Sequence, residues 1–273
     1  MTPVRPTFSV IIPAYQRADH LERCLEALVT VCAGRDDCEV IVVDDGSAVP
    51  LEDAVLAFSG RLPVRYLQQA NAGPGAARNT GAAQARGEYL VFTDDDCLPT
   101  PGWLTALYGE LAAEPHRLVG GPLRNALTDN PYSAASAAIV ELAYAYYNRD
   151  WRHARFLATN NLAVPADTFR ILGGFDQRFR TAEDRDLCDR WRAAGYPLVY
   201  APDAVVLHAH TLTLRRFWRQ HVGYGRGAYR FYRAHAQRTA GESTLDASFY
   251  FEVLQTLPRL LAGQPFGRAV GLL

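Results

Sequence analysis

The sequence predicts an α/β protein with a mostly parallel central sheet flanked by helices and a helical C-terminal extension. In the first 100 residues, short apolar runs alternate with segments of helical periodicity. The runs are apolar throughout rather than at every second position, which is typical of parallel strands buried on both faces. Polar residues follow these runs directly, at the edge of the sheet where α/β proteins bind ligands.

The elements of this first part follow from its apolar patterns. The expected strands are residues 8–13, 39–43, 64–67 and 89–93. The expected helices are residues 19–28, 54–58 and 75–85. Strands that alternate with helices predict parallel neighbours joined by helical crossovers.

The rest of the chain is richer in helical patterns. Residues 102–155 include an expected helix at 133–147, and a strand is expected at 198–207. Residues 213–238 then hold seven arginines and no acidic residue. The glycines at 223–227 predict a break, so we expect a pair of basic helices there.

Composition excludes several classes of protein. The chain is 49% hydrophobic and 21% charged with a net charge of −1, whereas a general nucleic-acid binder carries a basic excess, so no nucleic-acid partner is expected. Its five cysteines lack CxxC spacing, which predicts neither a disulfide framework nor a zinc site and favours a reducing, cytoplasmic location. No apolar run reaches the roughly 18 residues of a membrane-spanning helix.

The C-terminal tail, residues 249–273, is apolar with three charged side chains. The interpretation we favour is an amphipathic helix packed on the domain or on a partner, such as a second copy of the chain. The alternative is peripheral contact with the inner face of a membrane, through this tail and the basic segment before it.

Three adjacent acids, Asp94, Asp95 and Asp96, follow the fourth expected strand. Their mutual repulsion is costly unless a cation or hydrogen-bond donors share the site. The cluster therefore indicates a divalent metal ion together with an anionic ligand. The alternative is an acidic turn that caps a following helix.

Two further segments follow strands in the same way. Asp44 and Asp45 end the second strand, where an acid can contact a nucleotide, although the missing GxGxxG motif argues against a nicotinamide cofactor. The glycine-rich run 71–75 precedes a helix that carries Arg78, and its backbone N–H groups could face an anion. A tight connection with small residues explains the glycines equally well.

Two polar pairs mark the later half of the chain. Glu183 and Asp184 begin a helix, after a loop with two adjacent glycines, and a carboxylate there could accept a proton from a hydroxyl group. Charge at a helix start also interacts favourably with the helix dipole, which is the alternative explanation. His208 and His210 alternate at a strand end, so both imidazoles share one face and could bind a metal.

Together these segments resemble the family 2 glycosyltransferases, which have the GT-A nucleotide-sugar-binding fold. The matching pieces, in the family's order and over residues 7–210, are SVIIPAYQR, EVIVVDDGS, NAGPGAARNTGAAQARGEYLVFTDDDCLP, NNLAVPADTFRILGGFDQRFRTAEDRDLCDRW and VVLHAH. The resemblance implies one GT-A domain over residues 1–212, with a nucleotide-binding half (7–100) and an acceptor-binding and catalytic half (101–212). Residues 213–273 form the extension.

The resemblance also implies roles for individual residues. The nucleotide-sugar donor would be bound by Pro13, Ala14, Tyr15, Arg17, Asp45, Gly73, Arg78, Asp94 and Asp95. Mn²⁺ or Mg²⁺ would be held by Asp96, Asp94 and His208. Catalysis would fall to Asp184 as general base, beside Glu183. Acceptor contacts are expected at Asn160, Asn161, Gly174 and Trp191.

The expected function is an inverting, metal-dependent transfer of one sugar from a nucleoside diphosphate donor to a carbohydrate, lipid-linked or other hydroxyl acceptor, in polysaccharide or glycoconjugate biosynthesis. Processive synthesis is not expected, because the QxxRW motif of processive relatives is replaced by Gln220-His-Val-Gly-Tyr224. A sugar-phosphate nucleotidyltransferase is the alternative enzyme, but the first strand turn lacks its glycine-rich basic motif. A non-catalytic nucleotide-sugar-binding protein is a third possibility, disfavoured by the presence of Asp96 and Asp184.

Overall fold

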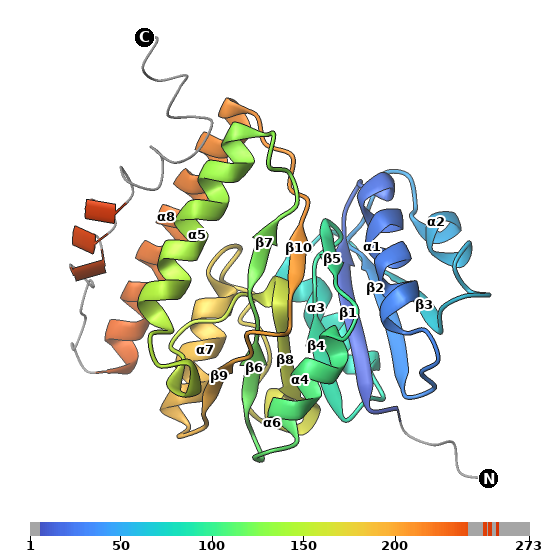
Figure 1. The fold of residues 1–273 in the computed structure, drawn as a ribbon, viewed down its shortest axis with the longest axis horizontal. Helices are drawn as coiled ribbons and strands as arrows, with labels where there is room; N and C mark the ends of the chain where they lie inside the picture. Colours follow the sequence, from blue (N-terminus) through green and yellow to red (C-terminus); the bar gives the residue numbers. More distant parts are fainter. Residues whose placement is uncertain (1–5, 240–247, 250, 253–254, 257–273) are drawn as a thin grey trace.

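A computed structural model of the chain describes residues 6–239, 248–249, 251–252 and 255–256. At its centre is a seven-stranded sheet with the order β3-β2-β1-β4-β8-β6-β9 (Figure 1). The strands are β1 (Phe8–Ala14), β2 (Cys38–Asp44), β3 (Val64–Gln68), β4 (Tyr89–Phe92), β6 (Leu118–Gly120), β8 (Leu162–Pro165) and β9 (Leu198–Tyr200). Most of the predicted apolar tail at 249–273 lies outside the described residues.

Most neighbours in this sheet run parallel. β1 pairs in parallel with both β2 and β4, and β2 with β3. β8 runs antiparallel to β4 and β6, while β9 is parallel to β6. The predicted α/β fold with a mostly parallel sheet is therefore confirmed.

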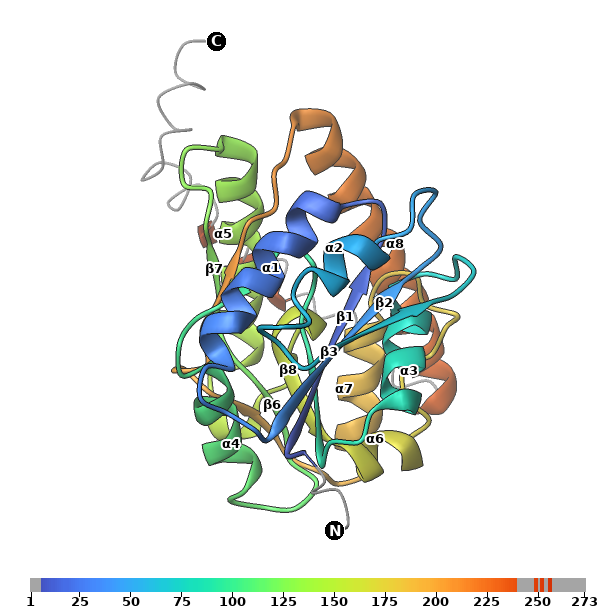
Figure 2. The ribbon, with the colours of Figure 1, turned by 90° about the vertical axis from the view of Figure 1, so that its right-hand side faces the viewer.

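Helices cover both faces of the sheet (Figure 2). Buried apolar residues of one face come from α1, α2 and α4, and those of the other face from α3, α6 and α7. The bounds are α1 (Ala18–Val31), α2 (Glu52–Leu56), α3 (Pro74–Gln84), α4 (Trp103–Leu111), α6 (Ala166–Ile171) and α7 (Glu183–Ala193). Burial on both faces explains why the strands are apolar throughout.

A second, three-stranded sheet lies beside the first. It consists of β5 (Cys97–Pro99), β10 (Val206–His208) and β7 (Leu123–Asn125), in the order β5-β10-β7. His208 is paired with Cys97 in the antiparallel β10–β5 ladder, which places this histidine next to the acids that follow β4. The single strand predicted at 198–207 is thus wrong: the segment divides into β9 and β10, which belong to different sheets.

Two long helices, α5 (Pro131–Tyr147) and α8 (Leu214–Arg238), lie side by side (Figure 1). Two 3₁₀ turns, η1 (Trp151–His153) and η2 (Thr159–Asn161), follow α5. The predicted break at 223–227 is wrong, because α8 is one continuous helix. Its glycines serve close packing instead, since a Cβ on Gly227 would lie 2.3 Å from Thr181 Oγ1. Among the described helices, none is long and apolar enough to span a bilayer.

Candidate active site

A cavity of about 760 Å³ lies beyond the carboxyl ends of β1, β2 and β4 and reaches to α5, α7 and α8. This is the edge at which the strand pattern predicts a ligand site. The predicted site residues that line it are Pro13, Ala14, Tyr15, Arg17, Asp45, Gly73, Arg78, Asp94, Asn160, Glu183, Asp184 and His208. Asp95 and Asp96 are buried and paired with Arg17.

The two acids that follow β2 have different surroundings. Asp44 is fully buried and accepts hydrogen bonds from the backbone N–H groups of Ser47 and Leu51, which fixes the turn. Asp45 lines the cavity and accepts the backbone N–H groups of Ala72 and Gly73 at 2.9 and 2.8 Å. Asp45 therefore holds the glycine-rich loop against the end of β2.

The acids that follow β4 are held by cationic partners. Arg17 donates from Nε to Asp95 Oδ2 at 3.1 Å and from Nη1 to Asp96 Oδ2 at 2.9 Å. The other oxygen of Asp96 lies 3.2 Å from His208 Nε2. Each carboxylate thus has a fixed position, and the repulsion between them is offset by Arg17 and His208.

These contacts separate the pKa values of the two buried acids. Burial raises the pKa of Asp95 to about 7, although the charge of Arg17 opposes the shift. Burial also disfavours ionisation of Asp96, but hydrogen bonding to His208 and the charges of His208 and Arg17 outweigh it, so the pKa of Asp96 is lowered. Asp96 therefore ionises at a lower pH than Asp95.

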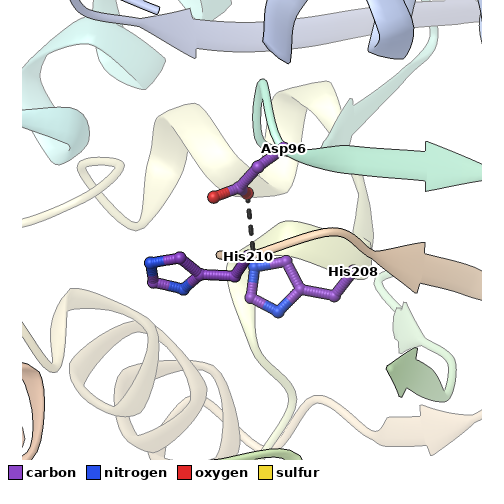
Figure 3. A group of neighbouring side chains, drawn as sticks. All are labelled: Asp96, His208 and His210. Atoms are coloured by element: carbon purple, nitrogen blue, oxygen red, sulfur yellow. Dashed lines mark ion pairs between the residues drawn. The ribbon is translucent and has the colours of Figure 1, made fainter. Parts of the chain in front are cut away.

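Asp96, His208 and His210 form a group that fits a metal ion (Figure 3). Each offers one ligand atom, and these atoms lie within 4.8 Å of one another. Burial lowers the pKa of His210 to about 4, so its imidazole is neutral and keeps a lone pair for a metal. The bound position of the Arg17 guanidinium shows that this carboxylate accommodates a cation. Of the predicted ligands, Asp96 and His208 belong to the group, whereas Asp94 points to another partner.

That partner is Arg78, which joins the end of β4 to the start of α7. Its Nη2 donates to Asp94 Oδ1 at 2.6 Å and its Nη1 to Glu183 Oε1 at 2.8 Å. The side chain is only 3% exposed, and burial alone would lower its pKa, but the two carboxylates raise it. Arg78 is therefore a permanent cation that links the two acidic segments, and its terminal nitrogens are occupied by carboxylates.

Asp184 is placed by a special turn at the start of α7. The preceding Ala182 has a left-handed backbone with φ of 72°, a conformation that is uncommon outside glycine. The Asp184 Oδ1 atom accepts the backbone N–H of Arg185 at 2.8 Å. Burial raises the pKa of Asp184, and it raises that of the neighbouring Glu183 to about 7 against the charge of Arg78. A carboxylate with a raised pKa is a stronger base than an ordinary aspartate.

Three of the predicted acceptor-binding residues lie elsewhere, and we correct them. The Asn161 side chain is fully buried and accepts from Trp103 Nε1 at 2.8 Å. Trp191 is fully buried and donates from Nε1 to the carbonyl of His116. Gly174 lies against Asn79 in a left-handed turn outside the cavity lining. All three serve packing, so we remove them from the acceptor site.

Several lining residues are not identified by the family motifs. His210 is marked only by its alternation with His208 along the strand. Residues of α5 and α8 were missed, among them Ser136, Gln220 and Tyr224. The available signal was weak: small residues recur at helical spacing in α5, but helical spacing alone does not say what the helix faces.

The strand order and the cavity at the strand ends are those of an α/β protein of the GT-A type. Residues 9–172 match the sequence model of "Glycosyl transferase family 2". The chain belongs to this family of glycosyltransferases, as its motifs predicted.

Curated relatives support the same assignment. The chain is 33% identical over 242 residues to "Pre-mycofactocin glycosyltransferase" of Mycobacterium tuberculosis, covering 85% of this chain and 49% of that protein. It is 31% identical over 212 residues to "Glycosyltransferase AglE" of Haloferax volcanii, and the match covers 76% of this chain and 68% of that protein. The chain thus spans about half the length of the first of these relatives.

Solved structures show the same fold at lower identity. The mannosyltransferase PcManGT from Pyrobaculum calidifontis, in complex with GDP-Man and Mn²⁺, superposes with a TM-score of 0.71 at 22% identity, covering 99% of this chain and 80% of that one. TarS of S. aureus, residues 1–349 in complex with UDP-GlcNAc, superposes with a TM-score of 0.63 at 17% identity, and the match covers 94% of this chain and 73% of that one. The GT-A fold is therefore confirmed.

Proposed function

We propose that the chain transfers a single sugar, with inversion, from a nucleoside diphosphate sugar to a hydroxyl acceptor, with Mn²⁺ or Mg²⁺ bound. The observation that carries the proposal is that one cavity is lined both by the carboxylate of Asp184 and by His208 and His210, two members of the group that could hold a metal ion. Family membership supports the reaction class. The metal-bound and nucleotide-sugar-bound structures of similar fold support the donor class.

The donor would lie along the strand ends. Asp45 and Gly73 line the part of the cavity next to β1 and β2, where Tyr15 is half exposed and offers an aromatic face to a base. The Arg17 guanidinium, which lines the same cavity, suits a diphosphate. Asp94 is 26% exposed and lines the same cavity, so it can accept a hydrogen bond from a ribose hydroxyl.

The residues that would hold the ion are Asp96, His208 and His210. Two imidazole nitrogens favour Mn²⁺ over Mg²⁺, because Mg²⁺ is held almost entirely by oxygen. When bound, the ion would supply Lewis-acid stabilisation of the departing diphosphate. Arg17 adds a second positive charge beside Asp96. Asp94 pairs with Arg78. We therefore propose that its role at the metal site would be indirect, through a hydrogen bond to another ligand of the ion.

Asp184 would act on the acceptor. Its carboxylate takes the proton of the acceptor hydroxyl as that oxygen bonds to the anomeric carbon, and the bond from this carbon to the diphosphate breaks on the opposite face. Glu183 and Arg78 position the start of α7 through their ion pair at 2.8 Å. One base on one face is sufficient for inversion, so no covalent intermediate is needed.

The experiment is a donor panel of UDP-glucose, UDP-N-acetylglucosamine and GDP-mannose with Mn²⁺ or with a chelator. We expect nucleoside diphosphate release that needs the metal and falls sharply in Asp184→Asn, and NMR of the product should show the inverted anomer. Pyrophosphate release from a nucleoside triphosphate and a sugar phosphate would instead establish the nucleotidyltransferase. Nucleotide binding without turnover of any donor would establish a non-catalytic protein.

We also propose that the enzyme works at the cytoplasmic face of a membrane in polysaccharide or glycoconjugate biosynthesis. On α8, Leu214 and Trp218 are 61% and 70% exposed, and Arg215, Arg219 and Arg226 are exposed on the same helix. Arginines beside exposed aromatic residues suit an anionic lipid surface. Sedimentation with phosphatidylglycerol vesicles but not phosphatidylcholine vesicles would support this contact. Concentration-dependent dimerisation without vesicle binding would assign the face to a second copy of the chain.

A further inference from the structure

The cavity continues past the catalytic residues into a space between α5 and α8. On α5 the lining residues Ser136, Val140 and Ala143 are spaced four and three residues apart, and Ala137 also lies three residues before Val140. Residues at this spacing share one face of a helix. Because α5 and α8 lie side by side (Figure 1), this face of α5 is directed at α8.

The facing side of α8 carries the same kind of residue. Gly225 and Ala228 line the cavity together with Gln220 and Tyr224, again at the spacing of one helical face. A Cβ added to Gly225 would meet no atom within 4 Å. Small side chains on both helices therefore leave a space that the described residues do not fill.

The lining of this space has a large apolar part. Its polar side chains Ser136, Gln220 and Tyr224 are hydrogen-bonded to one another, whereas Ala137, Val140, Ala143 and Ala228 cannot hydrogen-bond. A sugar ring placed against these four residues would bury hydroxyl groups without partners, which is unfavourable. An alkyl or aryl group would lose water contact at no such cost.

Among the described residues, three side-chain atoms of the cavity lining are unsatisfied, and one of them is Nε of the ion-paired Arg78. Asn160 Oδ1 and His221 Nε2 are buried and have no hydrogen-bond partner among the described residues, and both side chains line the cavity. Buried polar atoms without partners are rare in folded proteins, and each calls for an explanation such as a bound ligand. These atoms suit the hydroxyl groups of an acceptor.

We infer that the acceptor is amphiphilic, with a hydroxyl-bearing head at Asp184, Asn160 and His221 and an alkyl or aryl body between α5 and α8. The inference rests on the proposed transferase function and specifies the class of its acceptor. It distinguishes an amphiphilic alcohol or glycolipid-like acceptor from a free sugar or a polysaccharide chain. The small residues of both helices set the width of the space, so a single large side chain there should block it.

The test is the binding of n-alkyl β-D-glucosides, from methyl through butyl to octyl, below their micelle-forming concentrations. Isothermal titration calorimetry in the presence of Mn²⁺ and a nucleoside diphosphate gives Kd without any turnover. We expect Kd to fall by about fourfold for each methylene that is buried, as hydrophobic transfer predicts. Equal Kd values for the methyl and octyl compounds would overturn the inference.

Matched tryptophan variants locate the alkyl chain. Ala137→Trp fills the space from α5, whereas Ala145→Trp places the same side chain at an exposed position of α5 outside this cavity. The chain-length dependence should disappear in Ala137→Trp and persist in Ala145→Trp. Its persistence in both variants would show that the alkyl chain binds elsewhere and would overturn the inference.

A milder variant covers the case in which Ala137→Trp does not fold. Ala228→Leu, on the opposite helix, narrows the same space and should raise Kd for the octyl compound at least tenfold more than for the methyl compound. The assay also separates this inference from the proposed function. Alkyl-chain binding without transfer from any donor would refute the transferase, whereas transfer to acceptors with no chain-length dependence would refute only the amphiphilic acceptor.

Discussion

The cavity has two walls that differ in how their side chains are held. On the strand-end wall, Asp45 and Asp94 have backbone or charged partners at 2.9 and 2.6 Å, and the buried Asp96 next to them is held by Arg17 at 2.9 Å. On the helical wall, the hydrogen bond from Gln220 to Ser136 spans 3.3 Å, and most other lining side chains are small or apolar. Paired charges therefore hold the side chains of the strand-end wall in place. The helical wall has few such pairs, and its small side chains leave open space in the cavity.

This difference assigns different tasks to the two walls. A developing negative charge is stabilised best by groups that are already oriented before the reaction, which matches the strand-end wall. An apolar surface without oriented polar groups recognises shape and size rather than a hydrogen-bonding pattern. Substitutions on the strand-end wall should therefore change the chemical step, and those on the helical wall should change acceptor binding and stability.

The largest effect is expected from Asp184→Asn. Loss of a general base typically slows a reaction by about 10²- to 10⁴-fold, and asparagine keeps the shape and the hydrogen bond from the Arg185 backbone N–H. We expect kcat to fall in this range while the Kd of the donor nucleotide changes little. Glu183→Gln is the control, since Glu183 contacts Arg78 rather than the acceptor in this proposal. An Asp184→Asn enzyme with near-normal kcat would remove Asp184 as the base.

The second prediction concerns metal affinity at His210. His210→Ala removes one of three ligand atoms that lie within 4.8 Å of one another. Changes outside the direct ligands already weaken metal binding by about 10- to 100-fold, so the loss of a ligand should weaken Mn²⁺ binding at least tenfold. Electron paramagnetic resonance of free Mn²⁺ measures this without turnover. The control is His20→Ala, a histidine outside the metal-binding group and the cavity lining, and equal Mn²⁺ affinity in both variants would refute the ligand role.

The third prediction concerns pH. Burial raises the pKa of Asp184, against the charges of Arg185 and Arg78. A base works only when ionised, so activity should be lost as pH falls through this raised pKa, above the ordinary aspartate value of about 3.9. Measured with saturating Mn²⁺ at each pH, kcat/KM should fall by about tenfold per unit of pH on this limb.

A variant of Glu183 shows, in the same experiment, whether the pH dependence comes from Asp184 or from Glu183. The pKa of Glu183 is raised to about 7 by burial, although Arg78 opposes the shift. Glu183→Gln should keep an acidic limb if Asp184 is the base. A flat profile in Glu183→Gln down to the ordinary aspartate range would assign the limb to Glu183 instead.

The strand-end wall was also the part that the sequence could predict. Continuous apolar strands with polar residues after them are local patterns, and they placed Asp45, Asp94 and His208 at one edge of the sheet. The family motifs added Asp184. These residues are identifiable because each lies at a fixed offset from a strand or helix end.

Where a side chain points depends on contacts between distant segments, and there prediction failed. Trp191 and Asn161, which the motifs place at the acceptor site, are fully buried. Trp191 bonds to the carbonyl of His116, and Asn161 bonds to Trp103 and to the carbonyls of Pro122 and Ala204. The glycines of α8 predicted a break, yet Gly227 is the contact with Thr181. Nothing in the local sequence distinguishes a glycine that ends a helix from one that lets another segment approach.

The smallest expected effect is on stability, and it concerns two glycines of α8, a helix of the helical wall, that differ in their surroundings. In Gly227→Ala the new Cβ would lie 2.3 Å from Thr181 Oγ1 and 2.8 Å from its carbonyl oxygen, whereas in Gly223→Ala it would meet nothing within 4 Å. Alanine in place of a helical glycine stabilises by roughly 0.5–1 kcal/mol. Gly223→Ala should therefore raise the thermal midpoint slightly, and Gly227→Ala should lower it, because overpacking costs about 1–3 kcal/mol.

The same pair connects the helical wall to Asp184, the proposed base. Thr181 lies three residues before Asp184, and its Oγ1 also donates to the Gly223 carbonyl at 3.2 Å. A displaced α8 in Gly227→Ala should therefore disturb the turn that positions Asp184 and lower kcat several-fold, with the Kd of the donor nucleotide preserved. Gly223→Ala keeps its carbonyl and should keep kcat. If both variants gained stability equally and kept full activity, α8 would not be held against Thr181, and the two walls of the cavity would act independently.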